Sequence, residues 1–276
     1  MKADLHVHSV QSDGSLTRRE ILLRAQALGI THLAFTEHDD TRFAAAAQAL
    51  GRSFGVTVLP AVEISAFDEA LGRRAHILGY LYTRTAAIEA VCAPVLRRRH
   101  ENCLRQLAVL AQHGYRITPA DVLPYAQGGT LYKQHLLQYL VDSGQSEALF
   151  GEVYRRFFAP GGLCVHRIDY PDARAAVAAI HADGGYAVLA HPGQQQNFAL
   201  VPALAAAGLS GIELNHPSNS EEDRRRVRAL CAQHGLFCTG GSDFHGAYET
   251  GRDQLGAFLA PDDCPLPSLA AEANAR

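Results

Sequence analysis

Histidine and carboxylate side chains recur in short motifs along the whole chain. His6-Val-His8 and Asp243-Phe-His245 each place two such side chains two residues apart, and in an extended strand this spacing points both in the same direction. Imidazoles and carboxylates without a thiolate favour Mn²⁺, Fe²⁺ or Zn²⁺ in a hydrolytic site and disfavour a closed structural zinc site. The candidate metal ligands are His6, His8, Asp13, His38, Glu63, His76, His191, Asp243 and His245.

This set of ligands is too large for one ion. With a bridging carboxylate it could hold two or three divalent ions and leave positions for water, with Mn²⁺ as the first expectation and Fe²⁺ or Zn²⁺ as alternatives. A lone histidine, by contrast, is more often an ordinary surface or core residue. That interpretation is given to His100, His113, His181 and His234.

The candidate ligands gather where predicted strands end. Short apolar runs alternate with Ala- and Leu-rich helical stretches in both outer parts of the chain, and this βαβα rhythm predicts parallel strands. Thr17 and Glu20 form a capping-box pattern that opens one helix, and Gly29 is suited to end it. Active sites of β/α barrels are built at the C-terminal rim of the strands. The predicted strands are Asp4–Val7, His32–Phe35, Val56–Val62, His76–Leu81, Tyr186–Ala190, Gly211–Leu214 and Leu236–Thr239.

The middle of the sequence shows no strand alternation. We expect residues 85–165 to form a helical insertion that covers the active site. Residues 1–84 and 166–276 would then form one α/β barrel that carries the metal site, because the β rhythm before and after the insertion continues as one series. The expected helices are Val95–His113, Pro119–Ala126, Tyr132–Ser143 and Glu147–Phe157.

Composition excludes several classes of protein. The chain has 276 residues and is 47% apolar, which suffices for one sizeable core or a core with an inserted subdomain. Its net charge of −3 lacks the basic excess of a protein that binds long DNA, although a small anionic substrate is allowed. The polar N-terminus and the lack of a spanning apolar run predict neither a signal peptide nor a membrane anchor. Six scattered cysteines without a C-x-x-C pair suit reduced thiols, so we expect a cytoplasmic protein.

The sequence resembles the PHP (polymerase and histidinol phosphatase) family of metal-dependent phosphoesterases. The motifs DLHVHSVQSDG, TEHD, HILGY, AHPG and GSDFHG, together with Glu63, occur in the family's order and cover essentially the whole chain outside the helical segment. The resemblance implies a distorted barrel of about seven βα units with a trinuclear metal site in its mouth. It suggests three ligand groups, which are His6, His8, Glu63 and Asp243; Glu63, His76 and His191; and Asp13, His38 and His245. The residues that it would place in catalysis are Asp13, His38, Glu63, His191 and His245.

Within this family, the long insertion looks most like the subgroup that hydrolyses small nucleotide phosphates, especially nucleoside 3′,5′-bisphosphates. That subgroup carries an Arg-Pro-His-like segment, followed by a helix ending in LVxxG. Here the segment reads Tyr132-Lys133-Gln134-His135, so Lys133 supplies a point charge where arginine would supply a planar fork. The alternative is that Lys133 and His135 are only helix-surface residues. The candidate substrate contacts are Lys133, His135, Arg99, Asn102, Ser9, Asn215 and His216.

The resemblance implies a phosphomonoesterase. We expect a hydroxide bridging two metals to attack phosphorus and remove the 3′-phosphate of a nucleoside 3′,5′-bisphosphate, which leaves the 5′-monophosphate. The sequence has neither a G-x-S-x-G elbow nor a P-loop motif, in agreement with water as the nucleophile. One alternative is a 5′→3′ exonuclease that acts on short oligonucleotides, including RNA. An alternative of another class is a non-catalytic metal-binding interaction module, which would predict eroded ligands.

Overall fold

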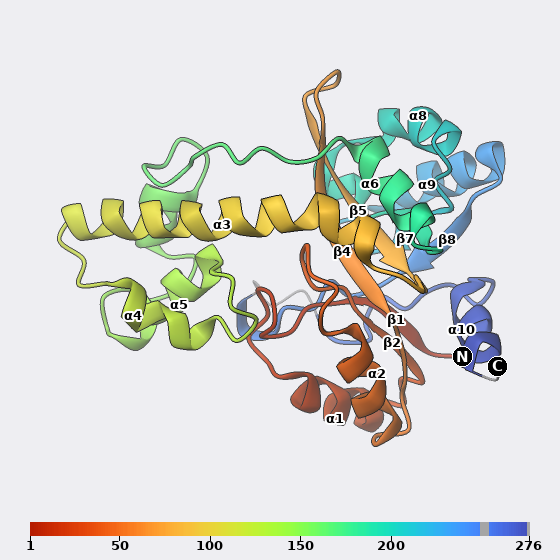
Figure 1. The fold of residues 1–276 in the computed structure, drawn as a ribbon, viewed down its shortest axis with the longest axis horizontal. Helices are drawn as coiled ribbons and strands as arrows, with labels where there is room; N and C mark the ends of the chain where they lie inside the picture. The colour runs from red at the N-terminus through yellow and green to blue at the C-terminus, as the bar shows by residue number, and fades with distance from the viewer. Residues whose placement is uncertain (249–253, 275–276) are drawn as a thin grey trace.

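Two β-sheets form the centre of the computed structural model, which describes residues 1–248 and 254–274 (Figure 1). The first sheet is parallel and has the order β1-β2-β3. The second has the order β4-β5-β6-β7-β8, in which β6, β7 and β8 are parallel and β5 is antiparallel to both of its neighbours. The strands are β1 (Ala3–Val7), β2 (His32–Phe35), β3 (Thr57–Leu59), β4 (Ala61–Asp68), β5 (Arg73–Tyr80), β6 (Tyr186–Leu189), β7 (Gly211–Asn215) and β8 (Phe237–Gly240).

The two sheets meet around a shared apolar core. Leu5 of the first sheet packs in one cluster with Leu78 and Val188 of the second. The Tyr80 hydroxyl donates to the carbonyl of Leu5 at 2.7 Å. Isolated bridges between Val7 and Phe244 and between His38 and Glu63 join the sheet edges. Within the described residues, the hydrogen-bonded strands form two separate sheets and no closed barrel. The fold is of the mixed α/β type.

The expectation of uniformly parallel strands is wrong in one region. The predicted strand Val56–Val62 splits into β3 and β4, and β4 then continues to Asp68 and pairs with β5 as a hairpin. His76 therefore lies inside β5, opposite Ser65, and does not begin a strand. Because β5 runs in the opposite direction, its first half lies at the edge where the parallel strands end. This reversal brings His76 to the same edge as the other candidate ligands.

Helices cover the outer faces of the sheets. Thr17 and Glu20 form the capping box of α1, and Gly29 ends that helix with a φ of 68°. Ser220 and Asp223 cap α9 in the same way. These outer helices are α1 (Arg18–Leu28), α2 (Ala44–Arg52), α6 (Ala173–Ala182), α7 (Pro192–Gln195), α8 (Val201–Ala206), α9 (Glu221–His234) and α10 (Leu266–Asn274), with short 3₁₀ turns at Phe198–Leu200 and Gly246–Tyr248.

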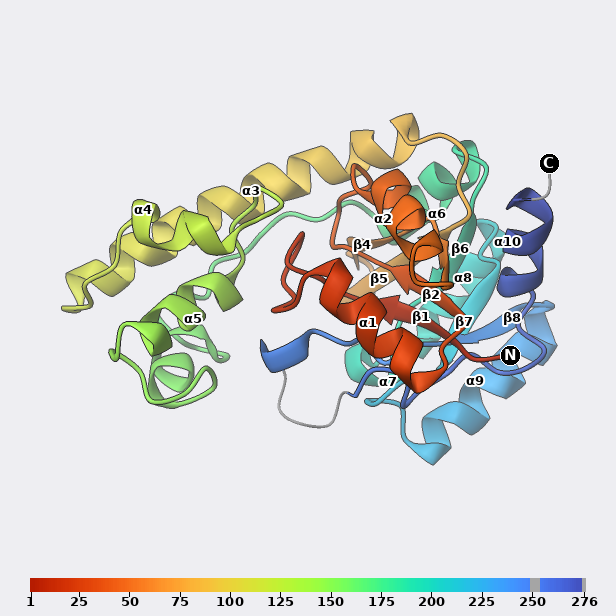
Figure 2. The ribbon, with the colours of Figure 1, turned by 90° about the horizontal axis from the view of Figure 1, so that it is seen from below.

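A long helix, α3 (Ala86–Gln112), connects the sheets to a second group of helices (Figures 1 and 2). It begins nine residues before the predicted Val95 and contains Pro94. Its first half packs Ile88 and Cys92 against the sheet core, and its second half belongs to a separate core cluster. The other elements here are α4 (Pro119–Val122), a 3₁₀ turn (Leu123–Tyr125), α5 (Lys133–Asp142) and a π-helix (Tyr154–Phe158), which replaces the longer helix expected from Glu147.

The boundaries predicted for the helical insertion remain a prediction, because α3 contributes to both core clusters. At about 40 Å, α3 is long enough to reach from one cluster to the other. Among the described residues, no helix combines the length and apolar character needed to cross a membrane.

Candidate metal centre

The candidate metal ligands converge at one edge of the two sheets. His6 lies in β1, Glu63 in β4 and His76 in β5, while the other six ligands lie in the loops that follow strands. Most of these side chains are buried, and the imidazoles of His6 and His8 are fully so. The folded chain thus brings together all nine residues that the sequence analysis selected as ligands.

Glu63 occupies the middle of this cluster. Its two carboxylate oxygens face five imidazole nitrogens between them, which is the arrangement expected of a carboxylate shared between metal ions. Oε2 lies 3.2 Å from His6 Nε2, 3.1 Å from His8 Nε2 and 3.3 Å from His38 Nδ1, and Oε1 lies 2.7 Å from His76 Nδ1 and 2.9 Å from His191 Nε2.

Asp243 and Asp13 flank the centre. Asp243 Oδ1 lies 3.2 Å from Nε2 of both His6 and His8. Asp13 Oδ1 lies 3.4 Å from His245 Nε2, and Asp13 Oδ2 lies 3.8 Å from His38 Nε2. The loop that carries Asp243 passes so close to β1 that a Cβ on Gly241 would lie 2.2 Å from the Cβ of His6. Any larger residue at position 241 would clash with His6, so this position requires glycine.

Electrostatics favour charged carboxylates at this centre and shift the imidazoles in different directions. Burial opposes a charge on His6, but Glu213, Asp243 and Glu63 raise its pKa well above the usual range. Burial alone would raise the pKa of Glu63, but the surrounding imidazoles, with His38 foremost, hold that pKa well below its usual range. Asp13 shows the same balance, and its pKa is also well below the usual range. Burial lowers the pKa of His38 to about 3. Charged carboxylates and a neutral His38 imidazole are the protonation states in which these three side chains can bind a metal ion.

The donor set fits divalent metal ions. His8 Nε2, Asp13 Oδ1, His38 Nδ1 and His191 Nδ1 are buried and have no hydrogen-bond partner in the part of the chain that the structure describes. Buried polar atoms without partners are rare, so a cation is the natural partner of such donors. Four sets of ligand atoms lie within 4.8 Å of one another: His8, Asp13, His38 and His245; His6, His8, Glu63 and Asp243; His38, Glu63 and His76; and His6, Glu213 and His216.

Glu213 is a buried residue of this cluster that the sequence analysis did not select. Its Oε1 lies 2.9 Å from His6 Nδ1, and its Oε2 accepts the backbone N–H of His191 at 2.7 Å. Its position at the end of the strand pattern Gly211–Leu214 was the available signal. A carboxylate behind a ligating imidazole fixes the tautomer and the orientation of the ring.

Three positions of the centre adopt left-handed backbone conformations without being glycine. Asp39, His191 and Asp243 have φ values of 57°, 26° and 51°. Such conformations cost about 1–3 kcal/mol each and persist only where the surroundings enforce them. Hydrogen bonds hold two of them, because the Asp39 N–H donates to the Glu63 carbonyl at 2.9 Å and the His191 N–H donates to Glu213 Oε2 at 2.7 Å.

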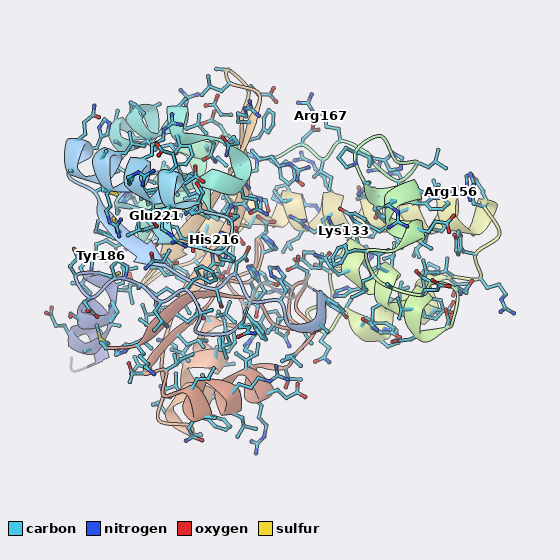
Figure 3. All side chains as sticks on the ribbon, turned by 180° about the vertical axis from the view of Figure 1, so that it is seen from behind. Lys133, Arg156, Arg167, Tyr186, His216 and Glu221 are labelled. Carbon is cyan, nitrogen blue, oxygen red and sulfur yellow. The ribbon has the colours of Figure 1, made fainter. Side chains whose placement is uncertain are left out.

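A cavity of about 650 Å³ opens in front of the metal cluster. Cluster residues such as Glu63 and Asp243 line it together with Arg99, Asn102 and Gln106 of α3. Lys133 and Gln134 at the start of α5 also line it. Figure 3 shows Lys133 where the helical group meets the sheets, with His216 deeper on the sheet side.

Arg99 connects the cavity wall to a metal-site loop. Its Nη2 donates to Asp39 Oδ2 and to Ser65 Oγ, each at 2.9 Å. Its guanidinium also lies 5.0 Å from the ring centre of Tyr132, whose hydroxyl donates to the His38 carbonyl at 3.1 Å. The helical group thus fixes the loop that presents His38.

The predicted substrate contacts fall into two groups. Lys133, Arg99 and Asn102 line the cavity. The other four do not line it. The Ser9 hydroxyl donates to Glu37, His135 accepts the Tyr132 backbone N–H at 3.2 Å, Asn215 donates to the Leu259 carbonyl at 2.8 Å, and His216 Nε2 lies 3.2 Å from Asp243 Oδ2.

A family model agrees with this geometry. The model of the PHP domain matches residues 4–151, which is more than half of the chain. The chain belongs to the PHP family. PHP membership and the buried cluster together identify it as a metal-dependent phosphoesterase, a hydrolase of phosphoric esters.

Relatives of this chain are named for activities on different substrates. A phosphoribosyl 1,2-cyclic phosphate 1,2-diphosphodiesterase of Eggerthella lenta is 44% identical over 90% of this chain and 95% of its own. A 3′,5′-nucleoside bisphosphate phosphatase of Chromobacterium violaceum is 33% identical over 91% of this chain and 89% of its own. The 5′-3′ exoribonuclease Rnm of Escherichia coli is 31% identical over 88% of this chain and 84% of its own.

Solved structures have the same fold over almost the whole length. A protein of Bifidobacterium adolescentis assigned as a metal-dependent phosphoesterase superimposes with a TM-score of 0.86 at 30% identity, covering 95% of this chain and 93% of its own. An amidohydrolase of Chromobacterium violaceum with bound sulfate and no metal gives a TM-score of 0.84 at 30% identity, covering 99% of this chain and 96% of its own. The helical group is therefore included in the shared architecture.

Proposed function

We propose that this PHP protein hydrolyses a phosphate ester on a small ribose phosphate that carries a second phosphate group. The observation that carries the proposal is the lining of the cavity. Glu63 and other cluster residues line the same space of about 650 Å³ as Arg99 and Lys133, and this size is suited to a small ligand. One phosphoryl group can meet the metal centre while a second meets the cations.

The first candidate substrate is a phosphoribosyl 1,2-cyclic phosphate. What favours it is the 44% identity with the Eggerthella lenta enzyme over nearly the full length of both chains. In this chain, Lys133 and Gln134 also depart from the Arg-Pro pattern that is typical of bisphosphate phosphatases.

The second candidate is the 3′-phosphate of a nucleoside 3′,5′-bisphosphate, whose removal would leave the 5′-monophosphate. The 33% identical Chromobacterium violaceum enzyme supports it. Both candidates place two phosphate groups on one ribose. Short RNA, suggested by the exoribonuclease relatives, shares part of that chemistry. A non-catalytic role is disfavoured, because all nine expected ligands are present and converge in the fold.

The side chains of the cluster would have separate roles in metal binding and catalysis. Divalent ions held by the cluster, with Mn²⁺ as the first expectation and Fe²⁺ or Zn²⁺ as alternatives, would supply Lewis-acid stabilisation of phosphoryl oxygens and acidify water. Glu63 would be shared between two ligand sets, and the third set would comprise Asp13, His38 and His245. His191 completes the proposed catalytic group, because its Nε2 faces Glu63 Oε1 at 2.9 Å.

Lys133 is better placed than Arg99 to hold the second phosphate. Arg99 already shares its Nη2 with Asp39 and Ser65, which restricts what it can offer to a ligand. Lys133 makes no ion pair within residues 1–248 and 254–274, and its Nζ lies 5.8 Å from the ring centre of Tyr154. A charged ammonium in a cavity without an anionic partner is a suitable phosphate contact.

A substrate panel tests the proposal. The Mn²⁺-loaded protein would be given phosphoribosyl 1,2-cyclic phosphate, adenosine 3′,5′-bisphosphate, 5′-AMP, histidinol phosphate and a short RNA, and product formation would be followed by chromatography. We expect the highest kcat/KM for a substrate with two phosphate-bearing positions on one ribose. Preferential cleavage of the RNA, or of phosphates on a single position, would contradict the proposal. Glu63→Gln is the matched control for catalysis by a contaminant.

A further inference from the structure

One face of the β4–β5 hairpin lines the cavity. In β4, Ser65 and Phe67 follow Glu63 at intervals of two residues. In β5, Arg74 precedes His76 by two residues, and His76 lies opposite Ser65. Because side chains alternate between the two faces of a strand, all five lie on one face of the hairpin. All five also line the cavity, so the hairpin extends its lining from the metal ligands toward Arg74.

The backbone around Arg74 is held in place on both sides. Arg74 pairs with Phe67 in a hairpin register that runs without a bulge from residue 61 to residue 80. Its carbonyl accepts a hydrogen bond from Asn197 Nδ2 at 3.0 Å. At a rise of about 3.4 Å per residue, the Cα of Arg74 lies about 7 Å along the strand from that of His76. The arginine therefore leaves the sheet at a fixed position beyond a metal ligand, on the same face.

The guanidinium of Arg74 has no anionic partner in the protein. The residue is exposed, and its side chain makes neither an ion pair nor a hydrogen bond within residues 1–248 and 254–274. Glu69, a carboxylate that also lines the cavity, instead accepts a hydrogen bond from Arg167 at 2.8 Å. The charge of Arg74 is thus available to a ligand.

Lys133 brings a second positive charge to the same cavity from the start of α5. Desolvation lowers the pKa of its ammonium, the Asp13 carboxylate raises that pKa, and the positive charges of Arg74 and Arg99 lower it again. Arg74 is therefore close enough to Lys133 to repel it. Arg99 is already paired with Asp39. An anion that contacts both Arg74 and Lys133 would replace their mutual repulsion with two attractions.

We propose that Arg74 and Lys133 together form an anion subsite that binds the second phosphate group of the substrate. This inference rests on the proposed function and adds Arg74 as a specificity-determining residue. The guanidinium offers paired N–H donors and the ammonium a point charge, and both suit phosphate oxygens. A substrate that fills the site carries one phosphate at the metal ligands and another farther along β5, which a compound with a single phosphate cannot do.

Steady-state kinetics of the Mn²⁺-loaded protein test the subsite. Arg74→Gln removes the charge and keeps a polar side chain, and Arg74→Lys restores a charge without the planar fork. Arg73→Gln is the matched control, because Arg73 is the adjacent exposed arginine of β5, lies on the opposite face and does not line the cavity. The substrates are adenosine 3′,5′-bisphosphate, phosphoribosyl 1,2-cyclic phosphate and p-nitrophenyl phosphate.

We expect Arg74→Gln to raise KM about tenfold for the two-phosphate substrate that the wild type cleaves, and much less for p-nitrophenyl phosphate. Arg74→Lys should recover part of this loss, and Arg73→Gln should keep the wild-type KM. If both cations bind one phosphate, Arg74→Gln and Lys133→Ala are coupled, and KM of the double variant departs from the product of the two single effects. Single effects that simply multiply would overturn the shared subsite.

Other outcomes separate the subsite from the proposed function. An unchanged KM in Arg74→Gln, or an equal rise in Arg73→Gln or with p-nitrophenyl phosphate, overturns the subsite alone. A wild-type protein that cleaves neither two-phosphate substrate contradicts the proposed function. Adenosine 3′,5′-bisphosphate is then not consumed, so calorimetry can compare its affinity for the wild type and Arg74→Gln. Binding about tenfold weaker in the variant supports the subsite, whereas equal affinity, or no binding to either protein, overturns it.

Discussion

Replacing Glu213 by glutamine should weaken metal binding without changing any predicted ligand. Both Glu213 and His6 are fully buried, and the carboxylate lies 2.9 Å from His6 Nδ1. It also accepts the backbone N–H of His191 at 2.7 Å. The ring of His6 and the backbone of His191 therefore depend on one carboxylate for their orientation. An amide has one acceptor oxygen, so it can retain only one of these two bonds and must turn a donor toward the other.

The size of the effect follows from the lost contact. A hydrogen bond to a charged group contributes about 1.5–3 kcal/mol, which corresponds to about 10- to 150-fold in an equilibrium constant. Changes behind metal ligands typically cost about 10- to 100-fold in metal affinity or activity. The two ranges agree, so we expect the Kd for Mn²⁺ to rise at least tenfold for Glu213→Gln.

The assay is metal content at graded concentrations of free Mn²⁺, measured by mass spectrometry after dialysis. Asp183→Asn is the matched control, because Asp183 is another buried carboxylate that accepts a backbone N–H, from Ile88 at 2.8 Å, but does not line the cavity. We expect Asp183→Asn to lower thermal stability and to leave the Mn²⁺ Kd unchanged. An unaltered Kd in Glu213→Gln would refute the reasoning.

Three other substitutions test separate parts of the account. Lys133→Ala should raise KM about 10- to 100-fold for a substrate with two phosphates and much less for p-nitrophenyl phosphate, because one charge-assisted contact is lost; equal changes in steady-state kinetics would remove its role. Asp13→Ala should lower the metal content by about one ion per chain, because it empties one proposed ligand set; unchanged metal content and rate would dismiss that set. Arg99→Lys keeps the charge but loses the planar guanidinium, which lies over the Tyr132 ring while its Nη2 bonds Asp39 and Ser65, so both kcat and the melting temperature should fall, and a variant with wild-type values in both assays would show that these contacts are dispensable.

Local sequence patterns selected residues that the fold brings together, because six of the nine expected ligands lie in loops that follow strands. His6 and His8 lie two residues apart at the end of a strand, and Asp243 and His245 repeat that spacing after another. Such positions depend on the direction of their own strand and on little else. The capping boxes of α1 and α9 are local in the same sense.

Features that depend on distant partners were not predictable in this way. The reversal of β5 depends on pairing with β4 and β6, and the apolar pattern of a short strand does not encode the direction of its neighbours. Glu213 was missed because its partner His6 is 207 residues away in sequence. His135 was selected because it matches a family segment, and Ser9 and Asn215 because they lie near the predicted strand ends. Each side chain makes a hydrogen bond within the protein that depends on a partner such a pattern does not reveal, and a substrate contact remains a prediction.

The central claim is that the buried cluster centred on Glu63 holds divalent ions and makes this PHP protein a phosphoesterase. The most direct measurement is phosphate release by chelator-treated protein as Mn²⁺ is added back, with phosphoribosyl 1,2-cyclic phosphate and adenosine 3′,5′-bisphosphate as substrates. Release from at least one of them should be absent without metal, rise with the first two or three equivalents, and stay absent in Glu63→Gln. Release that persists in the chelated protein, or that Glu63→Gln supports at the wild-type rate, would contradict the account.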